Sequence, residues 1–154
     1  FDKVAVLDVD AHHGDGTQQI FYQRSDVMTI SLHADPSSYY PFYTGYATER
    51  GHGAGYGYNL NFPLPHGTGD AGFLSALDSA LDALRDYRPQ ALVLALGFDP
   101  ISVLQVGLEA YRGVGERIHA LGVPTVVVQE GGYEVDAIGI ALEAFLAGFV
   151  PAMA

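Results

Sequence analysis

Four short, continuously apolar runs separated by helix-like segments constrain the fold of this chain more than any other feature. The apolar runs span residues 4–9, 27–32, 91–96 and 124–129. Leucines three and four positions apart predict a helix at 70–87, which ends before Pro89. Further helices are predicted at 17–23, behind the Asp15-Gly16 turn, at 108–121, before Gly122, and at 135–149. Because strands that are apolar throughout are buried on both faces, the pattern predicts an α/β fold with a parallel sheet and helices on both faces.

Composition narrows the classes of function. The 154 residues include no cysteine, which excludes disulfides and thiolate metal ligands and fits a cytoplasmic protein. No apolar run reaches the ~18 residues that a membrane span requires, so we expect no membrane partner. A net charge of −11 makes nucleic acid a poor partner. The same charge favours a cationic substrate, although solubility alone also explains it.

The segment 33–68 contains no convincing helix and is rich in Gly, Tyr and Pro. A loop this long in a compact domain is usually functional or disordered, and its aromatic side chains favour an ordered loop that lines a pocket. We therefore expect Phe42 and Tyr43 to line the substrate site. His33 is a further candidate for the pocket wall, although a packed histidine fits the pattern equally well.

Polar side chains gather where three of the predicted strands end. In a parallel α/β sheet, ligands bind at the carboxyl ends of the strands. Asp8, Asp10 and His12 alternate along one extended segment, so their side chains share a face. The three strand ends that carry these polar side chains are residues 8–16, 96–99 and 129–133.

A metal ion is the interpretation that this grouping favours. Carboxylate and imidazole groups suit Zn²⁺, and also Mn²⁺ or Fe²⁺. Asp10 and His12 would supply two ligands, and Asp99, which follows another strand, would supply the third. Such a set leaves one coordination position open for water and substrate, as a catalytic site requires. The alternative is an ordinary ion pair between Asp10 and His12 beside a turn.

The motifs at these strand ends resemble the histone deacetylase superfamily. They are Asp-Val-Asp-Ala-His-His-Gly-Asp-Gly-Thr at 8–17, Ser-Leu-His at 31–33, Leu-Gly-Phe-Asp at 96–99 and Glu-Gly-Gly-Tyr at 130–133. Residues 41–68 are most similar to the bacterial acetylpolyamine amidohydrolases. The resemblance implies the arginase/deacetylase-like fold, incomplete here, with residues 1–154 as the C-terminal part of a single deacetylase domain.

The resemblance also implies how the site would work. Tyr133 would be catalytic: its hydroxyl would donate a hydrogen bond to the polarised carbonyl oxygen and then to the oxyanion that forms from it. Gly131 and Gly132 would leave room for the substrate beside it. The zinc ligands would be Asp10, His12 and Asp99.

Two further carboxylates, Asp8 and Asp15, resemble the family's residues that orient a pair of catalytic histidines. Asp8 also resembles part of the family's potassium site, with the Ser31 hydroxyl and the backbone carbonyls of Leu32, Asp10 and His12. A K⁺ ion this close to zinc would alter local pKa values. For Ser31, a satisfied buried hydroxyl is an equally good interpretation.

The sequence departs from the family in two places. The family's general base lies in a Gly-His-His motif upstream of the first metal ligands, and this sequence has no such motif. General acid–base catalysis contributes ~10²–10⁴ in rate, so we expect these residues alone to be nearly inactive. Asp99 is followed directly by Pro100, where the family has several residues before a later Asp-Pro. Either this loop is shortened, or Asp99 corresponds to the later Asp and the third ligand is lost.

The expected activity is that of a zinc-dependent amidohydrolase that removes acetyl groups from acetylated polyamines and releases acetate. Its substrate would be a small cationic acetylated amine, and a homodimer is left open. Three alternatives remain. They are a deacetylase of protein acetyl-lysine, a degenerate deacetylase-like module that only binds, and a manganese ureohydrolase of the arginase kind.

Overall fold

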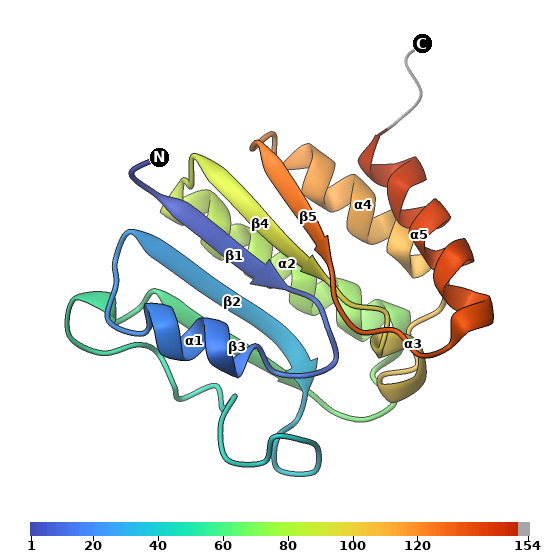
Figure 1. Cartoon of the computed structure of the whole chain (residues 1–154), viewed down its shortest axis with the longest axis horizontal. Helices are drawn as coiled ribbons and strands as arrows, with labels where there is room; N and C mark the ends of the chain where they lie inside the picture. The colour runs from blue at the N-terminus through green and yellow to red at the C-terminus, as the bar shows by residue number, and fades with distance from the viewer. Residues whose placement is uncertain (151–154) are drawn as a thin grey trace.

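Five parallel strands form the centre of the molecule (Figure 1). The structure is a computed structural model and describes residues 1–150. The strands are β1 (Val4–Asp8), β2 (Val27–Ala34), β3 (Asn59–Leu64), β4 (Ala91–Leu96) and β5 (Thr125–Gln129). They lie in the order β3-β2-β1-β4-β5. The chain leaves β1 toward one edge and leaves β4 toward the other, so a topological switch point lies between these two strands.

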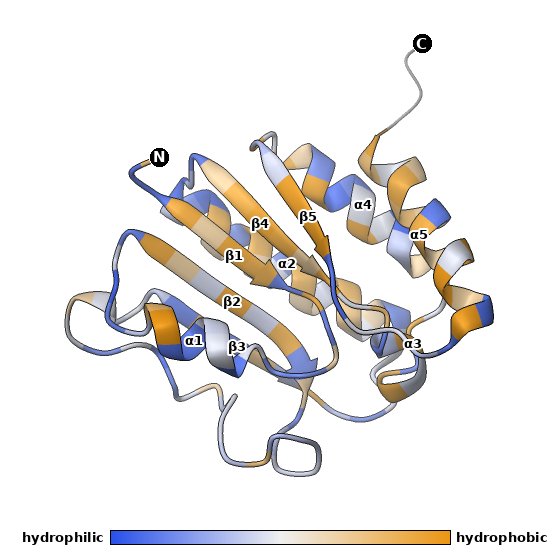
Figure 2. Ribbon diagram, in the orientation of Figure 1, coloured by the Kyte–Doolittle hydropathy of each residue, from blue (hydrophilic) through white to orange (hydrophobic). Residues whose placement is uncertain are grey.

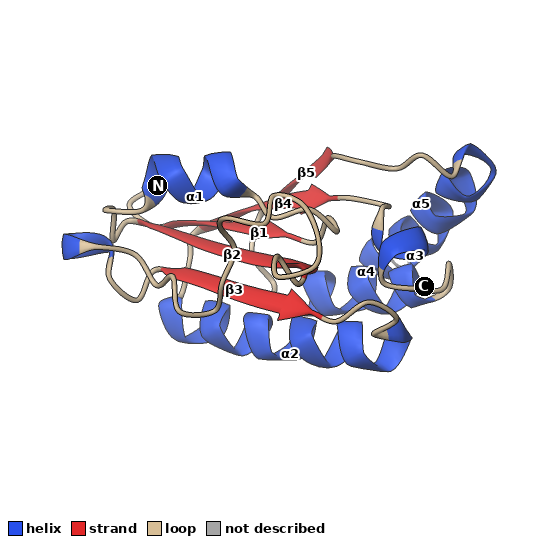
Figure 3. Cartoon of the chain, turned by 90° about the horizontal axis from the view of Figure 1, so that it is seen from below, coloured by secondary structure: helices blue, strands red, loops and turns tan. Residues whose placement is uncertain are grey.

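Helices lie on both faces of the sheet, which confirms the predicted α/β class. They are α1 (Asp15–Phe21), α2 (Gly69–Tyr87), α3 (Pro100–Val103), α4 (Ala110–Ala120) and α5 (Val135–Phe149), with a 3₁₀ turn at Gly53–Gly55. Figure 3 shows α1 on one face and α2 on the opposite face. Helix α5 packs against α4 rather than against the sheet. Within residues 1–150, no helix is both long and apolar enough to cross a membrane.

The core lies between the sheet and α2. Residues Leu77, Leu81 and Leu84 recur every three or four positions along α2, and all three are fully buried. They belong to one buried cluster with apolar residues of β1, β2 and β4, and Figure 2 colours these strands as largely hydrophobic. All eight residues of β2 are buried, including the polar Thr29, Ser31 and His33. The strand predicted at 27–32 is therefore buried on both faces, as a parallel sheet requires.

Strand β3 is absent from the elements that the sequence predicts. Its sequence, Asn-Leu-Asn-Phe-Pro-Leu, contains Pro63, which cannot donate a ladder hydrogen bond. The strand lies at the edge of the sheet, where a proline is tolerated. The polar residues Asn59 and Asn61 point into the interior, where they form hydrogen bonds to Gln18. Sequence pattern alone therefore hides this strand.

The opposite edge of the sheet is much more exposed. No residue of β5 is buried, and Val126 and Val128 are 63% and 42% exposed. Strand β5 pairs only with β4 among the described residues. The four residues 151–154 of the predicted domain lie outside the described part of the chain.

Candidate metal centre

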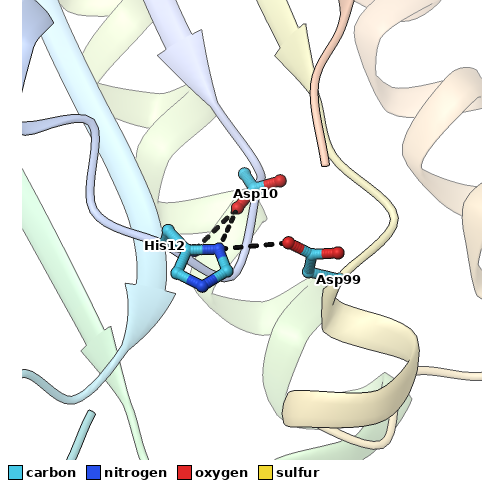
Figure 4. Close-up of side chains that lie close together, drawn as sticks. All are labelled: Asp10, His12 and Asp99. Carbon is cyan, nitrogen blue, oxygen red and sulfur yellow. Dashed lines mark hydrogen bonds and ion pairs between the residues drawn. The ribbon is translucent and has the colours of Figure 1, made fainter. Parts of the chain in front are cut away.

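Three side chains from two strand ends meet at the topological switch point (Figure 4). Asp10 and His12 follow β1, and Asp99 lies between β4 and α3. His12 Nδ1 is 3.0 Å from Asp10 Oδ1 and 3.1 Å from Asp99 Oδ2. One ligand atom from each residue lies within 4.8 Å of the other two. The sequence prediction that these groups converge is therefore confirmed, and Asp99 occupies the third position of the cluster.

Backbone hydrogen bonds hold the segment after β1 in a tight path. Asp8 Oδ1 accepts a hydrogen bond from the Asp10 amide at 2.9 Å, and Asp10 Oδ1 accepts one from the His12 amide at 2.8 Å. Asp10 Oδ2 accepts a third from the Gly131 amide at 3.1 Å, which ties the end of β5 to the end of β1. The orientation of the Asp10 carboxylate is thus fixed from two sides.

Two glycines leave the space that the carboxylates fill. A Cβ atom on Gly97 would overlap the Asp10 carboxylate, and one on Gly131 would overlap the Asp99 carboxylate. Any other residue at these positions would have to displace a carboxylate. The glycines of the Leu-Gly-Phe-Asp and Glu-Gly-Gly-Tyr motifs therefore shape the cluster itself.

The cluster carries unbalanced negative charge in a buried place. Asp10 and Asp99 are both buried, and Asp99 Oδ2 has no hydrogen-bond partner although His12 lies beside it. Burial and the Asp10 charge raise the pKa of Asp99, and His12 partly offsets this rise. Two buried carboxylates without a compensating cation are costly. Two carboxylates and one imidazole fit a divalent ion such as Zn²⁺ and leave an open position.

Asp8 lies next to this cluster and is also buried. Burial, with smaller contributions from the Asp10 and Glu130 charges, raises the pKa of Asp8 to about 7, against the effect of the Asp10 amide. Asp8, Asp10, His12 and Glu130 help to line a hollow of about 350 Å³. Asp15 begins α1 and accepts a hydrogen bond from the Tyr43 hydroxyl at 3.2 Å.

The residues predicted to form a potassium site lie close to Asp8. Ser31 is the cross-strand partner of Asp8 in the ladder between β1 and β2. The Ser31 hydroxyl is 2.8 Å from His33 Nδ1 and accepts a longer hydrogen bond from the Gly14 amide. Leu32 is fully buried. The Ser31 hydroxyl is thus a satisfied buried group, which was one of its two interpretations.

His33 belongs to the interior rather than to a pocket wall. It is 0% exposed, and its Nε2 lies 2.8 Å from the Gly45 carbonyl oxygen. Its ring lies against the His13 ring, with centroids 4.6 Å apart. Burial lowers the pKa of His33 to about 4, so the ring is neutral at pH 7. Of its two interpretations, the packed histidine holds: His33 does not line the substrate site, because the backbone at Gly45 lies against its ring.

The other predicted lining residues fall into separate places. Phe42 and Tyr43 are exposed, and Tyr43 lines a second hollow, of about 470 Å³, beside α1 rather than beside the metal cluster. Gly131 faces the carboxylates, as described above. A side chain on Gly132 would press against Phe98. Gly131 therefore leaves room for the carboxylates, and Gly132 leaves room for Phe98 and Ile138.

Tyr133 follows β5 at the same edge of the sheet and is 82% exposed. Burial, followed by the Asp99 and Asp10 carboxylates, raises the pKa of Tyr39, and Tyr133 makes a smaller contribution in the same direction. The catalytic role of Tyr133 stays a prediction.

Two aromatic residues that the sequence pattern does not single out, Tyr39 and Tyr40, lie beside His12. The Tyr39 hydroxyl is 3.3 Å from His12 Nε2, and the two rings lie 5.2 Å apart. The Tyr40 ring presents its edge to His12 at 6.3 Å. Both belong to the loop predicted to line a pocket, but only the fold shows which of its aromatics reach the metal cluster.

A partly buried polar network around Glu49 anchors this loop. Glu49 Oε2 accepts hydrogen bonds from Gln18 Nε2 at 2.7 Å and from the Gly45 amide and the Thr44 hydroxyl, both at 2.9 Å. Although burial opposes it, these hydrogen bonds lower the pKa of Glu49. Asn59 on β3 donates to the Glu49 carbonyl oxygen and to Gln18. The loop is therefore anchored to both α1 and β3.

Comparison with known proteins places this geometry in a family. The Histone deacetylase domain family matches residues 1–149. The acetylpolyamine amidohydrolase of Burkholderia pseudomallei is 47% identical over 152 residues, covering 96% of this chain and 45% of the relative. Acetylpolyamine amidohydrolase 1 of Pseudomonas aeruginosa is 50% identical over 152 residues, covering 96% and 44%.

Solved structures agree with this grouping. The crystal structure of the acetylpolyamine aminohydrolase from Burkholderia pseudomallei has a TM-score of 0.94 and 46% identity, covering 97% of this chain and 45% of that chain. An HDAC homolog complexed with SAHA has a TM-score of 0.90 and 33% identity, covering 97% and 42%. The chain thus spans less than half the length of these relatives. In sequence and in fold, it belongs to the histone deacetylase family.

Proposed function

We propose that this chain carries the metal centre of a zinc-dependent amidohydrolase that removes acetyl groups from acetylated polyamines. The observation that carries the proposal is the convergence of Asp10, His12 and Asp99 on one point at the switch between β1 and β4. The similarity to two proteins named acetylpolyamine amidohydrolase, at 47% and 50% identity, supports the choice of substrate. The products would be acetate and a free amine.

The residues of the chain would divide the chemistry between them. A zinc ion held by Asp10, His12 and Asp99 would activate water by lowering its pKa toward ~7 and would polarise the amide carbonyl. The hydroxyl of Tyr133, which is exposed at the same edge of the sheet, would donate a hydrogen bond to the developing oxyanion. Asp8 and Asp15 would orient the groups that transfer protons.

The general base would come from outside these residues. The chain covers about 45% of its relatives, and its sequence contains no Gly-His-His motif. Asp8 and His12 line an open hollow of about 350 Å³, which offers room for a proton-transfer group beside the cluster. We therefore treat residues 1–154 as part of a larger deacetylase domain and expect them to be nearly inactive alone.

Two finer points belong to the same proposal. The net charge of −11 would favour a cationic acetylated amine through long-range attraction. A K⁺ ion would bind near Asp8 and Ser31, which are partners across the sheet, together with the backbone carbonyls of Leu32, Asp10 and His12. Carbonyl and hydroxyl oxygens suit a hard cation.

The test compares two substrates with the full-length gene product. Turnover of acetylputrescine and of an acetyl-lysine peptide is measured with the zinc-loaded protein, and zinc content is measured in parallel. We expect one zinc per chain and a preference for acetylputrescine. A preference of tenfold or more for the peptide would reassign the substrate. Two manganese ions per chain and urea as product would establish an arginase-like enzyme instead.

A non-catalytic binding module is the second candidate, because the general base is missing from these residues. The sequence encoded upstream of Phe1 distinguishes the two. A Gly-His-His motif some tens of residues upstream supports the enzyme. Its absence, combined with no turnover of either substrate, would favour the binding module.

A further inference from the structure

His12 presents its two ring nitrogens to different surroundings. Nδ1 lies 3.0 and 3.1 Å from the carboxylate oxygens of Asp10 and Asp99, which makes it the ligand atom of the cluster. Nε2 points the other way and lies 3.3 Å from the Tyr39 hydroxyl. The imidazole is thus held between the cluster on one side and a phenol on the other.

The chemistry of a metal-bound imidazole fixes the direction of this second contact. A neutral imidazole that binds a cation through Nδ1 carries its proton on Nε2. That proton needs an acceptor, and the Tyr39 oxygen occupies the acceptor position. Histidine ligands almost always donate their outer N–H to a carboxylate, a carbonyl or water. Here a neutral phenol would fill that place.

Tyr39 itself is held in position by the fold. Its amide donates to the Asp35 carbonyl oxygen at 3.0 Å, in a turn that directly follows β2. Its ring packs against the core and meets the edge of the His66 ring, with centroids 5.5 Å apart. His12 and Tyr39 therefore lie on two segments that hydrogen bonds and packing hold in place. Their contact is part of the fold rather than a chance meeting of two surface side chains.

We propose that Tyr39 is a positioning residue for the metal centre, and that its hydroxyl holds the His12 ring with Nδ1 turned toward Asp10 and Asp99. This inference rests on the proposed zinc site. Loss of the hydroxyl leaves the Nε2–H of His12 without its protein acceptor and frees the ring to rotate. The expected consequence is weaker metal binding rather than a direct loss of a reacting group.

The test uses Tyr39→Phe in the full-length gene product, with Tyr40→Phe as the matched control. Each variant removes one hydroxyl from neighbouring residues, but only Tyr39 is in hydrogen-bond reach of His12. We expect Tyr39→Phe to weaken zinc binding about tenfold in competition with a chelator, and Tyr40→Phe to change it less than twofold. The visible spectrum of the cobalt-substituted protein should shift only in Tyr39→Phe.

Melting of the metal-free proteins separates a loss of fold from a loss of positioning. Equal melting temperatures for Tyr39→Phe and the parent, with weaker zinc binding, support the inference. Zinc affinity and cobalt spectrum unchanged in Tyr39→Phe, or changed equally in both variants, would overturn it. If the parent protein itself binds no zinc, the proposed function fails, and the inference fails with it.

Discussion

Strands β2 and β5 belong to one parallel sheet and have similar apolar sequences, yet their surroundings are opposite. Every residue of β2 is buried, between β1 and β3 and with helices on both faces. No residue of β5 is buried, and two of its three valines are exposed. An apolar run predicts a strand in both cases, but burial depends on the neighbours that the rest of the fold provides.

The candidate metal site formed by Asp10, His12 and Asp99 lies between these two regions and depends on both. Asp10 follows β1, which pairs directly with β2, while Gly131 and Tyr133 follow β5. The proposed ligands Asp10, His12 and Asp99 follow the inner strands β1 and β4, and Tyr133, the residue expected to act on the substrate, follows the exposed strand β5. Parallel sheets are normally covered on both faces. The exposure of β5 therefore fits a chain that spans less than half the length of its relatives.

The largest expected difference between the two sides concerns zinc. Asp10→Ala should remove stoichiometric zinc and lower kcat at least 10³-fold, because it deletes a ligand. Tyr133→Phe should keep the zinc and lower kcat by about 10²–10³-fold, since it removes one oxyanion donor. Zinc analysis and acetylputrescine turnover of the full-length protein measure both. Normal turnover in Tyr133→Phe would show that the exposed side does not take part in catalysis.

Core truncations compare the two strands directly. Ile30→Ala in β2 should lower the free energy of unfolding by about 2–5 kcal/mol, because Ile30 is almost fully buried. Val128→Ala in β5 should lower it by less than about 1 kcal/mol if β5 stays exposed. Urea unfolding of the full-length protein provides the values. A large loss for Val128→Ala would mean that another part of the full-length protein covers β5.

The pH dependence of stability should reveal the buried histidine of β2. The unfolded chain binds a proton at His33 with an ordinary pKa of 6.5, whereas the folded chain does so only near pH 4. Between these values the unfolded state holds more protons, so stability rises with pH. His33 should contribute roughly 3 kcal/mol, fully present above pH 6.5 and lost as the pH falls toward 4.

Metal-free His33→Gln, unfolded in urea from pH 4 to 7, isolates this contribution. Its stability should rise less steeply with pH than that of the parent. Asp8, whose pKa is raised by burial, acts in the opposite direction over an overlapping range, and it cancels in the difference between the two proteins. Identical slopes would contradict the burial of His33.

The smallest expected effect concerns the loop that covers the β2 side. Glu49→Gln should lower the free energy of unfolding by about 1 kcal/mol, because the amide replaces a carboxylate that accepts several hydrogen bonds. Amide exchange at Gly45 should accelerate. Asp26→Asn, which breaks an exposed ion pair with Arg24, serves as the control and should show no measurable change. Equal effects of the two substitutions would show that the hydrogen bonds of Glu49 stabilise the fold no more than an exposed ion pair does.

Periodicity and strand-end chemistry predict much of this molecule. Four strands, the long helices and the convergence of Asp10, His12 and Asp99 follow from local pattern and from the rule that parallel strands end at one edge. The pattern does not reveal β3, because its proline and asparagines resemble a loop until the sheet edge and the Gln18 network are known.

The surroundings of the cluster could not be predicted in the same way. Nothing in the spacing of residues 33–45 separates Tyr39, which reaches His12, from Tyr43, which reaches Asp15. The choice depends on how the loop folds over β2, and that path is set by Glu49 and its partners far along the sequence. For the same reason, the sequence could not decide whether His33 lines a pocket or packs in the interior.

The hydrogen bond from the Gly131 amide to Asp10 carries a consequence for the whole sheet. It couples the position of β5 to the orientation of the Asp10 carboxylate, a proposed metal ligand. If the proposed zinc site is correct, a segment that docks on β5 and shifts it would also move the Asp10 carboxylate, and zinc affinity would then report whether the sheet is fully assembled.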